Sequence, residues 1–256
     1  MKKRLDVLLV EKGFAETRSR AKALVEAGQV YLAKIGGEEK LEKVSLELPG
    51  DAPVFVKIGS ANRFVSRAGL KLEGALSRIG LSVVNWECLD VGQSTGGFTD
   101  CLLQSGAARV VGVDVGKDQL VQKLKEDSRV VFFEGLNARE LSRYSEVQDG
   151  FSNRKADLIV MDLSFISQIV VLPELSIFAE EKTRLISLVK PQFEVGPEGL
   201  GKGGIVRDPL LYEQVQRKIT EVAESHGWKV LDYFESPILG KEGNKEFFLY
   251  GIKTGD

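Results

Sequence analysis

An apolar run passes directly into a glycine-rich turn and then into a helical pattern at residues 89–100 of this 256-residue chain. The run ends at Asp90 and Val91, the turn begins at Gly92, and the helical pattern opens near Phe98. This order predicts a strand, a tight loop and a helix, the start of a β–α–β unit. Glycines let a loop backbone approach a ligand, and the N–H groups of the next helical turn point toward it. A nucleotide-like cofactor would fit, but such a turn also occurs as a plain connection.

The next apolar run, 109–114, ends in Asp114, about twenty residues after the turn, where doubly wound folds place a carboxylate that binds two ribose hydroxyls. This acid favours cofactor binding over a plain connection. An NAD-dependent oxidoreductase is compatible with the same two features.

Strand and helix patterns alternate from the glycine turn to the end of the chain. The clearest helix runs from Pro209 to His226, and helices are expected in the other gaps as well. The last two strands are joined by a connection too short for a crossover helix, so they should pair antiparallel. The pattern predicts an α/β, Rossmann-like domain with a seven-stranded, mostly parallel sheet, a last antiparallel strand and helices on both faces. The expected strands lie near 86–91, 109–114, 129–133, 157–162, 184–190, 228–236 and 246–253.

The first sixty residues have a different pattern. Two short helices, 4–12 and 17–27, precede a strand at 29–33, and a further short strand is expected at 54–58. Turn-forming residues then mark a boundary. We predict a small α+β domain over residues 1–60, a linker over 61–66 and the Rossmann-like domain over 67–256.

Composition excludes some functions. No run approaches the ~20 apolar residues of a spanning helix, so we expect a cytoplasmic protein that is neither exported nor membrane-embedded. Cys88 and Cys101 lack metal-ligand spacing and are expected to be reduced core thiols. With His226 as the one histidine, acid–base chemistry must use lysines or carboxylates, and no metal site is predicted. The net charge is −2, yet residues 1–33 carry a net charge of +3, which favours a local basic surface.

Polar residues follow the predicted strands at the edge where open α/β sheets bind ligands. Each could simply cap a strand end. Together, two lysines and two carboxylates suit deprotonation of a weakly acidic hydroxyl, because a second cation disfavours the ammonium form of a lysine base. The residues expected at this edge are Lys71, the stretch 90–97, Asp114, Asn137, Asp162, Lys190 and Glu246.

The amino-terminal sequence resembles an S4 RNA-binding module in the stretches Arg4–Gly13 and Thr17–Val30. In that family the second helix, and the basic residues around its start, face structured RNA. The resemblance and the local basic charge together predict RNA contacts at Arg4, Arg18, Arg20, Lys22, Gln29, Arg63 and Arg67.

Five further motifs resemble the TlyA family, which joins an S4 module to an FtsJ-like methyltransferase domain. The motifs are residues 64–72, 90–100, 157–167, 188–194 and 243–247. The resemblance implies S-adenosylmethionine as cofactor, ribosomal RNA in ribosomal subunits as partner, and methylation of ribose 2′-hydroxyls, with a cytidine as the suspected target.

The family's catalytic tetrad falls on Lys71, Asp162, Lys190 and Glu246. By resemblance, Lys190 removes the hydroxyl proton, and Lys71 and Glu246 position Lys190. Asp162 lies beside the methyl donor and the attacking oxygen. The implied cofactor-binding residues are Asp90, Gly92, Ser94, Thr95, Gly96, Gly97, Phe98, Asp114, Val115, Asn137 and Asp162.

Two other functions remain open. Relatives of this family have also been called haemolysins, but a membrane-active protein needs an amphipathic or spanning segment, and none is visible. An RNA-binding protein with an inactive methyltransferase domain is disfavoured because all four tetrad positions are filled.

Overall fold

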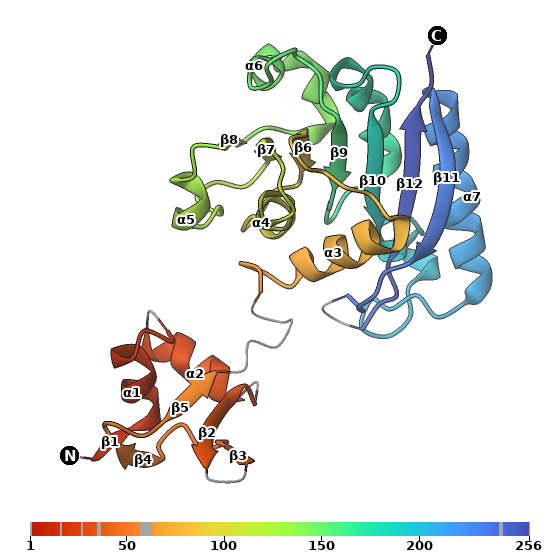
Figure 1. The fold of residues 1–256 in the computed structure, drawn as a ribbon. Coiled ribbons are helices and arrows are strands. Elements are labelled where there is room, and N and C mark those ends of the chain that lie inside the picture. The colour runs from red at the N-terminus through yellow and green to blue at the C-terminus, as the bar shows by residue number, and fades with distance from the viewer. Residues whose placement is uncertain are drawn as a thin grey trace. The chain divides into compact units, whose positions relative to one another are not determined.

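The computed structural model describes residues 2–15, 17–26, 28–34, 37–56, 63–240 and 243–255. The chain forms two compact units, Met1–Arg63 and Phe64–Asp256, each with its own core (Figure 1). Residues 27, 57, 58, 61 and 62, on which parts of the predicted second helix, second strand and linker fall, lie outside the described residues. The domain limits 1–60 and 67–256 stay predictions.

The first unit packs two helices against short strands. Helices α1 (Leu5–Glu11) and α2 (Arg18–Glu26) bury Leu8, Leu9, Leu24 and their apolar neighbours. Thr17 caps the start of α2, since its Oγ1 accepts a hydrogen bond from Arg20 N at 3.2 Å. The strands pair antiparallel in two small sheets, β1 (Lys2–Arg4) with β4 (Glu47–Pro49), and β2 (Val30–Lys34) between β3 (Gly37–Lys40) and β5 (Val54–Val56).

The second unit is built on a seven-stranded sheet, counted over the residues that the structure describes. Its strand order is β11-β12-β10-β9-β6-β7-β8, and β12 runs antiparallel to both of its neighbours. The predicted mostly parallel sheet with an antiparallel last strand is therefore confirmed. The strands are β6 (Glu87–Val91), β7 (Arg109–Asp114), β8 (Val130–Glu134), β9 (Leu158–Met161), β10 (Arg184–Val189), β11 (Trp228–Glu235) and β12 (Phe247–Lys253).

Alternate strand residues face two separate apolar layers, as the two-residue period of a strand requires. Leu89, Val111 and Ile159 belong to the layer that packs on helix α7 (Pro209–Ser225). Cys88, Val110 and Leu158 belong to the layer that packs on helices α3 (Ala68–Ile79) and α4 (Gly97–Gln104). Figure 1 shows α7 along one side of β11 and β12, and α3 and α4 on the opposite side. Cys88 and Cys101 are both buried and free, as expected for core thiols.

The crossovers contain less α-helix than the pattern predicts. Helices α5 (Gln122–Lys125) and α6 (Ser145–Asp149) are single turns, and the remaining connections use 3-10 turns. In the connection to β10, Pro173 lacks an N–H, and tight turns bring Leu175 and Phe178 onto the sheet over a short length of chain. The 3-10 turns span Ala138–Arg143, Gln168–Val170, Leu172–Phe178, Pro191–Phe193 and Pro197–Gly199.

The strand register brings the predicted site together at one edge of the sheet. Met161 of β9 pairs with Val91 of β6 and with Ser187 of β10, while Val189 of β10 pairs with Phe247 of β12. The residues just beyond these pairs are Gly92, Asp162, Lys190 and Glu246.

Candidate active site

The glycine loop between β6 and α4 passes close to the loop after β9 at Gly92. Gly92 has φ +86°, and a Cβ atom there would lie 2.6 Å from the carbonyl oxygen of Asp162. The absence of a side chain therefore permits the close approach of the loops after β6 and β9. Ser94 has the left-handed φ of +48° without being a glycine.

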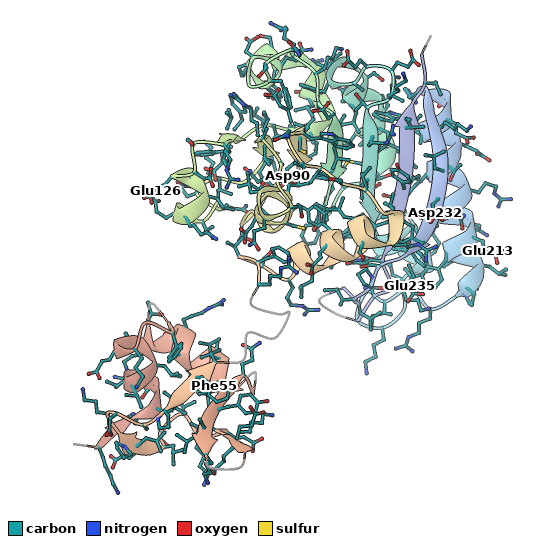
Figure 2. All side chains as sticks on the ribbon, in the orientation of Figure 1. Phe55, Asp90, Glu126, Glu213, Asp232 and Glu235 are labelled. Atoms are coloured by element: carbon teal, nitrogen blue, oxygen red, sulfur yellow. The ribbon has the colours of Figure 1, made fainter. Side chains whose placement is uncertain are left out.

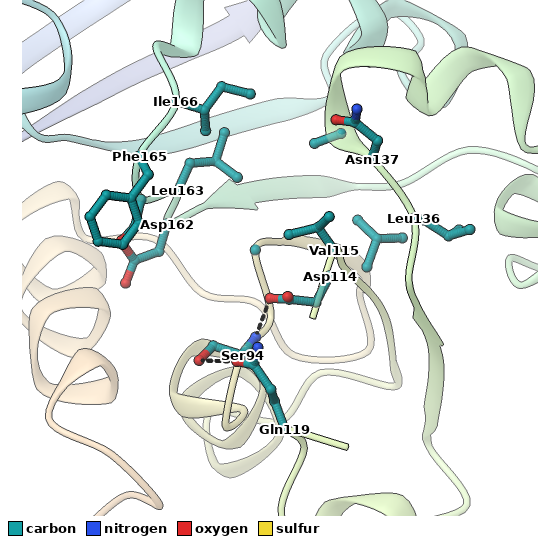
Figure 3. Close-up of a pocket in the computed structure, with 14 residues that line it drawn as sticks. Ser94, Asp114, Val115, Gln119, Leu136, Asn137, Asp162, Leu163, Phe165 and Ile166 are labelled. Carbon is teal, nitrogen blue, oxygen red and sulfur yellow. Dashed lines mark hydrogen bonds between the residues drawn. The ribbon is translucent and has the colours of Figure 1, made fainter. Parts of the chain in front are cut away.

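Asp114 at the end of β7 organises the neighbouring backbone. Its carboxylate accepts hydrogen bonds from Gly116 N at 2.7 Å and from Ser94 N at 2.8 Å. Figure 3 shows the bond from Ser94 N, and also the one that Ser94 Oγ donates to Gln119 Oε1 at 3.1 Å. The loop after β7 is also held by Glu134, whose pKa is lowered by hydrogen bonds from backbone N–H groups, that of Asp118 first. The loops after β6 and β7 are thus fixed to each other.

A cavity of about 560 Å³ opens beside these loops. Its wall combines apolar side chains with Asp114 and Asn137, and Asn137 Oδ1 accepts a hydrogen bond from Arg139 N at 3.1 Å. A volume in this range suits a small-molecule cofactor. Figure 3 shows the lining residues, which are Gly92, Ser94, Val113, Asp114, Val115, Gln119, Leu136, Asn137, Ala138 and the stretch 162–166.

A smaller cavity of about 120 Å³ adjoins the first and shares Gly92, Ser94, Asp162 and Ser164 with it. Lys190 lies in the wall of this smaller cavity, and Asp162, its ion-pair partner, lies in the walls of both. The other lining residues are Ser66, Ala68, Gln93, Thr95, Gly97 and Phe98.

The predicted tetrad forms two ion pairs at the same sheet edge. Lys190 Nζ lies 2.6 Å from Asp162 Oδ1 and donates to Ser164 Oγ at 2.9 Å. Lys71 Nζ of α3 donates to Glu246 Oε2 at 2.5 Å. All four side chains are largely buried, with at most 16% of each exposed. Each lysine therefore has a carboxylate partner that fixes its amine.

Asp90, a predicted cofactor residue, lies beneath the loop instead of in a cavity wall. Its Oδ2 accepts a hydrogen bond from Thr99 Oγ1 at 2.7 Å, and Gln93 Nε2 donates to the same hydroxyl at 2.8 Å. Burial raises the pKa of Asp90 to about 7. Figure 2 shows Asp90 inside the unit, whereas Glu126 and Glu213 project from its surface. Gly96 also lines neither cavity.

Two of the predicted RNA contacts converge on one buried carboxylate in the first unit. Asp6 accepts hydrogen bonds from Arg4 Nε at 3.0 Å and from Arg18 Nη2 at 2.7 Å. These guanidinium groups, Arg4 first, lower the pKa of Asp6 to about 2. Asp6 is 4% exposed, whereas both arginines reach solvent.

The other predicted RNA contacts divide by exposure. Gln29 is 7% exposed, which places its side chain inside the first unit. Arg67 Nη2 donates to the Leu239 carbonyl at 3.3 Å within the second unit. The remaining predicted contacts are exposed and comprise Arg20, Lys22 and Arg63, with Lys22 Nζ 3.6 Å from Glu26 Oε1.

Sequence reasoning missed three contributors to the site, namely Ser164, Phe165 and Glu194. The Phe165 side chain is 90% exposed at the cavity rim, its φ is +63°, and its ring centroid lies 5.1 Å from that of Phe193. Burial raises the pKa of Glu194, which accepts hydrogen bonds from the loop that carries Phe165. An aromatic residue three positions after a strand-end acid was the available signal for Phe165.

Residues 64–253 match the FtsJ-like methyltransferase family, and residues 3–34 match the S4 domain. The chain belongs to the FtsJ-like methyltransferase family. This methyltransferase is 44% identical to YqxC of Bacillus subtilis, described as a candidate rRNA methyltransferase, over 97% of this chain and 85% of that protein. It is 40% identical to the 16S/23S rRNA (cytidine-2′-O)-methyltransferase TlyA of Mycobacterium tuberculosis, over 96% and 88% of the two chains.

A solved structure from Streptococcus thermophilus, described as a candidate hemolysin, aligns with a TM-score of 0.72 at 41% identity. The alignment covers 99% of this methyltransferase and 89% of that chain. The predicted membership of the TlyA family is therefore confirmed. Across the described residues, we find no helix with both the length and the hydropathy to cross a bilayer. The same residues contain no cluster of three or more side chains suited to hold a metal ion.

Proposed function

We propose that this methyltransferase transfers a methyl group from S-adenosylmethionine to a ribose 2′-hydroxyl of ribosomal RNA, with cytidine as the target nucleotide. The observation that carries the proposal is the Lys190–Asp162 pair, 2.6 Å apart, beside a cofactor-sized cavity. Relatives described as rRNA methyltransferases support the substrate class. Because ribosomal subunits are its proposed partner, we expect it to act in the cytoplasm.

The residues around the larger cavity fit S-adenosylmethionine. Asp114 can accept from the two ribose hydroxyls, Asn137 can pair with the adenine edge, and Val115 and Leu136 supply an apolar wall. The glycine loop can lie close to the methionine portion because Gly92 has no side chain. When bound, this cofactor supplies a methyl group on a sulfonium centre, which an aligned oxygen attacks without help from a metal.

The four tetrad residues have separate roles in deprotonating the acceptor hydroxyl and stabilising the charge that develops on it. Lys190, as the neutral amine, accepts the 2′-hydroxyl proton on Nζ, and Asp162 pairs with the ammonium that this step forms. Lys71, fixed by Glu246, adds a positive charge at the same sheet edge and stabilises the developing alkoxide. Holding the reacting groups in line supplies much of the remaining rate.

Two features support RNA as the acceptor. The exposed Phe165 ring at the cavity rim offers a flat apolar surface on which an unstacked base can lie. The S4 domain presents Arg4 and Arg18 with their guanidinium groups fixed by Asp6, a geometry that suits phosphate contacts.

The test is methyl transfer from labelled S-adenosylmethionine to separated small and large ribosomal subunits from a strain that lacks this protein. We expect label in ribose with the wild type. For Lys190→Ala we expect a folded protein that binds the donor but transfers methyl at a rate lower by roughly 10² or more, because the proton acceptor is gone. Lys229→Ala, a change at an exposed lysine of β11, is the matched control and should retain the wild-type rate.

Near-normal turnover of Lys190→Ala would remove Lys190 from the role of base. Donor binding without label on either subunit would contradict the proposed substrate and favour an RNA-binding role without catalysis.

A further inference from the structure

Two segments of the second unit meet beyond the strand ends that carry the tetrad. We call residues 162–168, which follow β9, the Phe165 loop, and residues 190–194, which follow β10, the Lys190 segment. Lys190 Nζ donates to Ser164 Oγ at 2.9 Å, which joins the two near their beginnings. The proposed base and the exposed ring therefore belong to segments that touch.

The Phe165 ring needs its backbone to hold it in place. Phe165 is 90% exposed, so little core packing fixes its ring, whose centroid lies 5.1 Å from that of Phe193. A φ of +63° is unfavourable for a phenylalanine. Such a conformation persists only when contacts of the surrounding structure hold it.

Glu194 supplies the contact on the far side of Phe165. Its carboxylate accepts a hydrogen bond from Ser167 Oγ at 2.5 Å and another from Gln168 N at 2.8 Å. One carboxylate of the Lys190 segment thus holds the last two residues of the Phe165 loop. Lys190 holds the residue just before Phe165, so the two contacts bracket the ring.

Gln168 extends this connection into the sheet. Ser187 Oγ donates to Gln168 Oε1 at 2.5 Å, and Gln168 Nε2 donates to the Leu188 carbonyl. The Gln168 side chain therefore ties the end of the loop to β10, while its backbone N–H binds Glu194. Hydrogen bonds therefore join β10, the Phe165 loop and the Lys190 segment to one another.

We infer that Glu194 is a positioning residue for methyl transfer, which holds the Phe165 loop against the Lys190 segment so that ring and amine face the same target nucleotide. The inference rests on the proposed function, because it assigns Glu194 a role in presenting the RNA to Lys190. Glu194 lines neither cavity at the tetrad, so it acts through Ser167 and Gln168.

The test compares Glu194→Ala, Glu194→Gln and the control Glu198→Ala in methyl transfer to ribosomal RNA. Glu198 is an exposed carboxylate four residues further along the chain. We expect Glu194→Ala to lower kcat/KM for RNA by about tenfold or more, since small displacements of reacting groups are costly, with the donor Kd changed less than about threefold. Glu194→Gln should recover most of the loss, because its amide can accept from Gln168 N and donate to Ser167 Oγ. Glu198→Ala should match the wild type.

A double-mutant cycle separates positioning from a general loss of stability. If Glu194 acts through the ring, Phe165→Ala and Glu194→Ala should not be additive, and the double variant should resemble the worse single variant. Fully additive losses, or a Glu194→Ala enzyme with wild-type kcat/KM, would overturn the inference. A wild type that transfers no methyl would instead contradict the proposed function.

Ser167→Ala tests the same inference if the Glu194→Ala protein does not fold. It removes a hydroxyl that donates to Glu194 and accepts from Ile169 N at 3.3 Å, and it leaves Glu194 and its bond to Gln168 N in place. We expect a folded protein with kcat/KM for RNA lowered by about threefold or more and an unchanged donor Kd, because only the loop is loosened. A folded Ser167→Ala protein with wild-type kcat/KM would count against the positioning role.

Discussion

Asp90 shows how one residue can support a site without lining it. It is fully buried, its Oδ2 is held by Thr99, and its Oδ1 makes no hydrogen bond with any described residue. An ionised carboxylate in such surroundings is costly, which is why burial raises its pKa to about 7. The protonation state of Asp90 therefore affects the hydrogen bonds beneath the glycine loop.

We predict that Asp90 makes the protein less stable as the pH rises from about 4 to about 7. The folded pKa is about 7, whereas an unfolded aspartate titrates near ~3.9, so the folded state binds more protons in this window. The stabilisation by the bound proton is complete below the unfolded pKa and is lost as the pH rises through the folded pKa. Asp90→Asn does not titrate at this position. Its free energy of unfolding, taken relative to that of the wild type, should therefore be higher at pH 8 than at pH 5 by about 2 to 3 kcal/mol.

Urea unfolding at pH 5 and pH 8 measures this difference, with Asp232→Asn, a change at a partly exposed aspartate of β11, as the control. Parallel pH profiles for Asp90→Asn and the wild type would show that Asp90 is ionised throughout.

At the scale of elements, the sequence predicts the strands far better than the crossovers. The strand limits follow from apolar runs that end in charged residues, and β7 (Arg109–Asp114) spans the predicted residues. The crossovers differ because their short turns are set by packing on the sheet, which hydrophobic periodicity does not record.

The sequence also predicts which residue types meet at the sheet edge, but not their pairing. The spacing of Lys71, Asp162, Lys190 and Glu246 does not reveal that they form two separate pairs. The contacts of Glu194 join loops from two neighbouring strands, so they depend on tertiary structure alone.

The glycine loop gives a prediction at this scale. Gly92→Ala should weaken donor binding by about tenfold or more, because its new methyl group would meet the backbone oxygen of Asp162 at 2.6 Å and push the loops after β6 and β9 apart. Calorimetric titration with S-adenosylmethionine measures the change.

Gly80→Ala is the matched control for backbone strain. Gly80 ends α3 with φ +68°, and a Cβ atom there would have no neighbour within 4 Å. We expect a stability loss of about 1 kcal/mol and a donor Kd within about twofold of the wild type. Equal donor affinities in the Gly80 and Gly92 variants would show that the loop tolerates the displacement.

At the scale of the whole molecule, the proposed function assigns RNA binding to the first unit and methyl transfer to the second. The chain has a net charge of −2, yet residues 1–33 carry +3, so the S4 domain has a local excess of the positive charge that suits RNA. The tetrad, by contrast, balances two lysines with two carboxylates. Affinity for RNA and the rate of transfer should therefore respond to different substitutions.

We predict that the double variant Arg18→Ala with Arg20→Ala binds ribosomal RNA more weakly and with a smaller salt dependence. Each lost phosphate contact should reduce the slope of log K against log salt by about 0.7 to 0.9. Donor affinity should not change, because the cofactor cavity lies in the second unit. Filter binding over a series of salt concentrations measures the slope.

A second double variant, Lys12→Ala with Lys43→Ala, removes the same charge from the same unit at exposed positions outside the predicted RNA contacts. If the arginines contact phosphates, only their loss should reduce the slope by the full amount, and Asp6 should still hold Arg4 in the arginine variant. Equal slopes for the two double variants would mean that the S4 domain attracts RNA by its net charge alone. An RNA affinity unchanged by the arginine substitutions would assign Arg18 and Arg20 to a solvated face, and the contacts with the ribosomal subunit would then have to come from other residues.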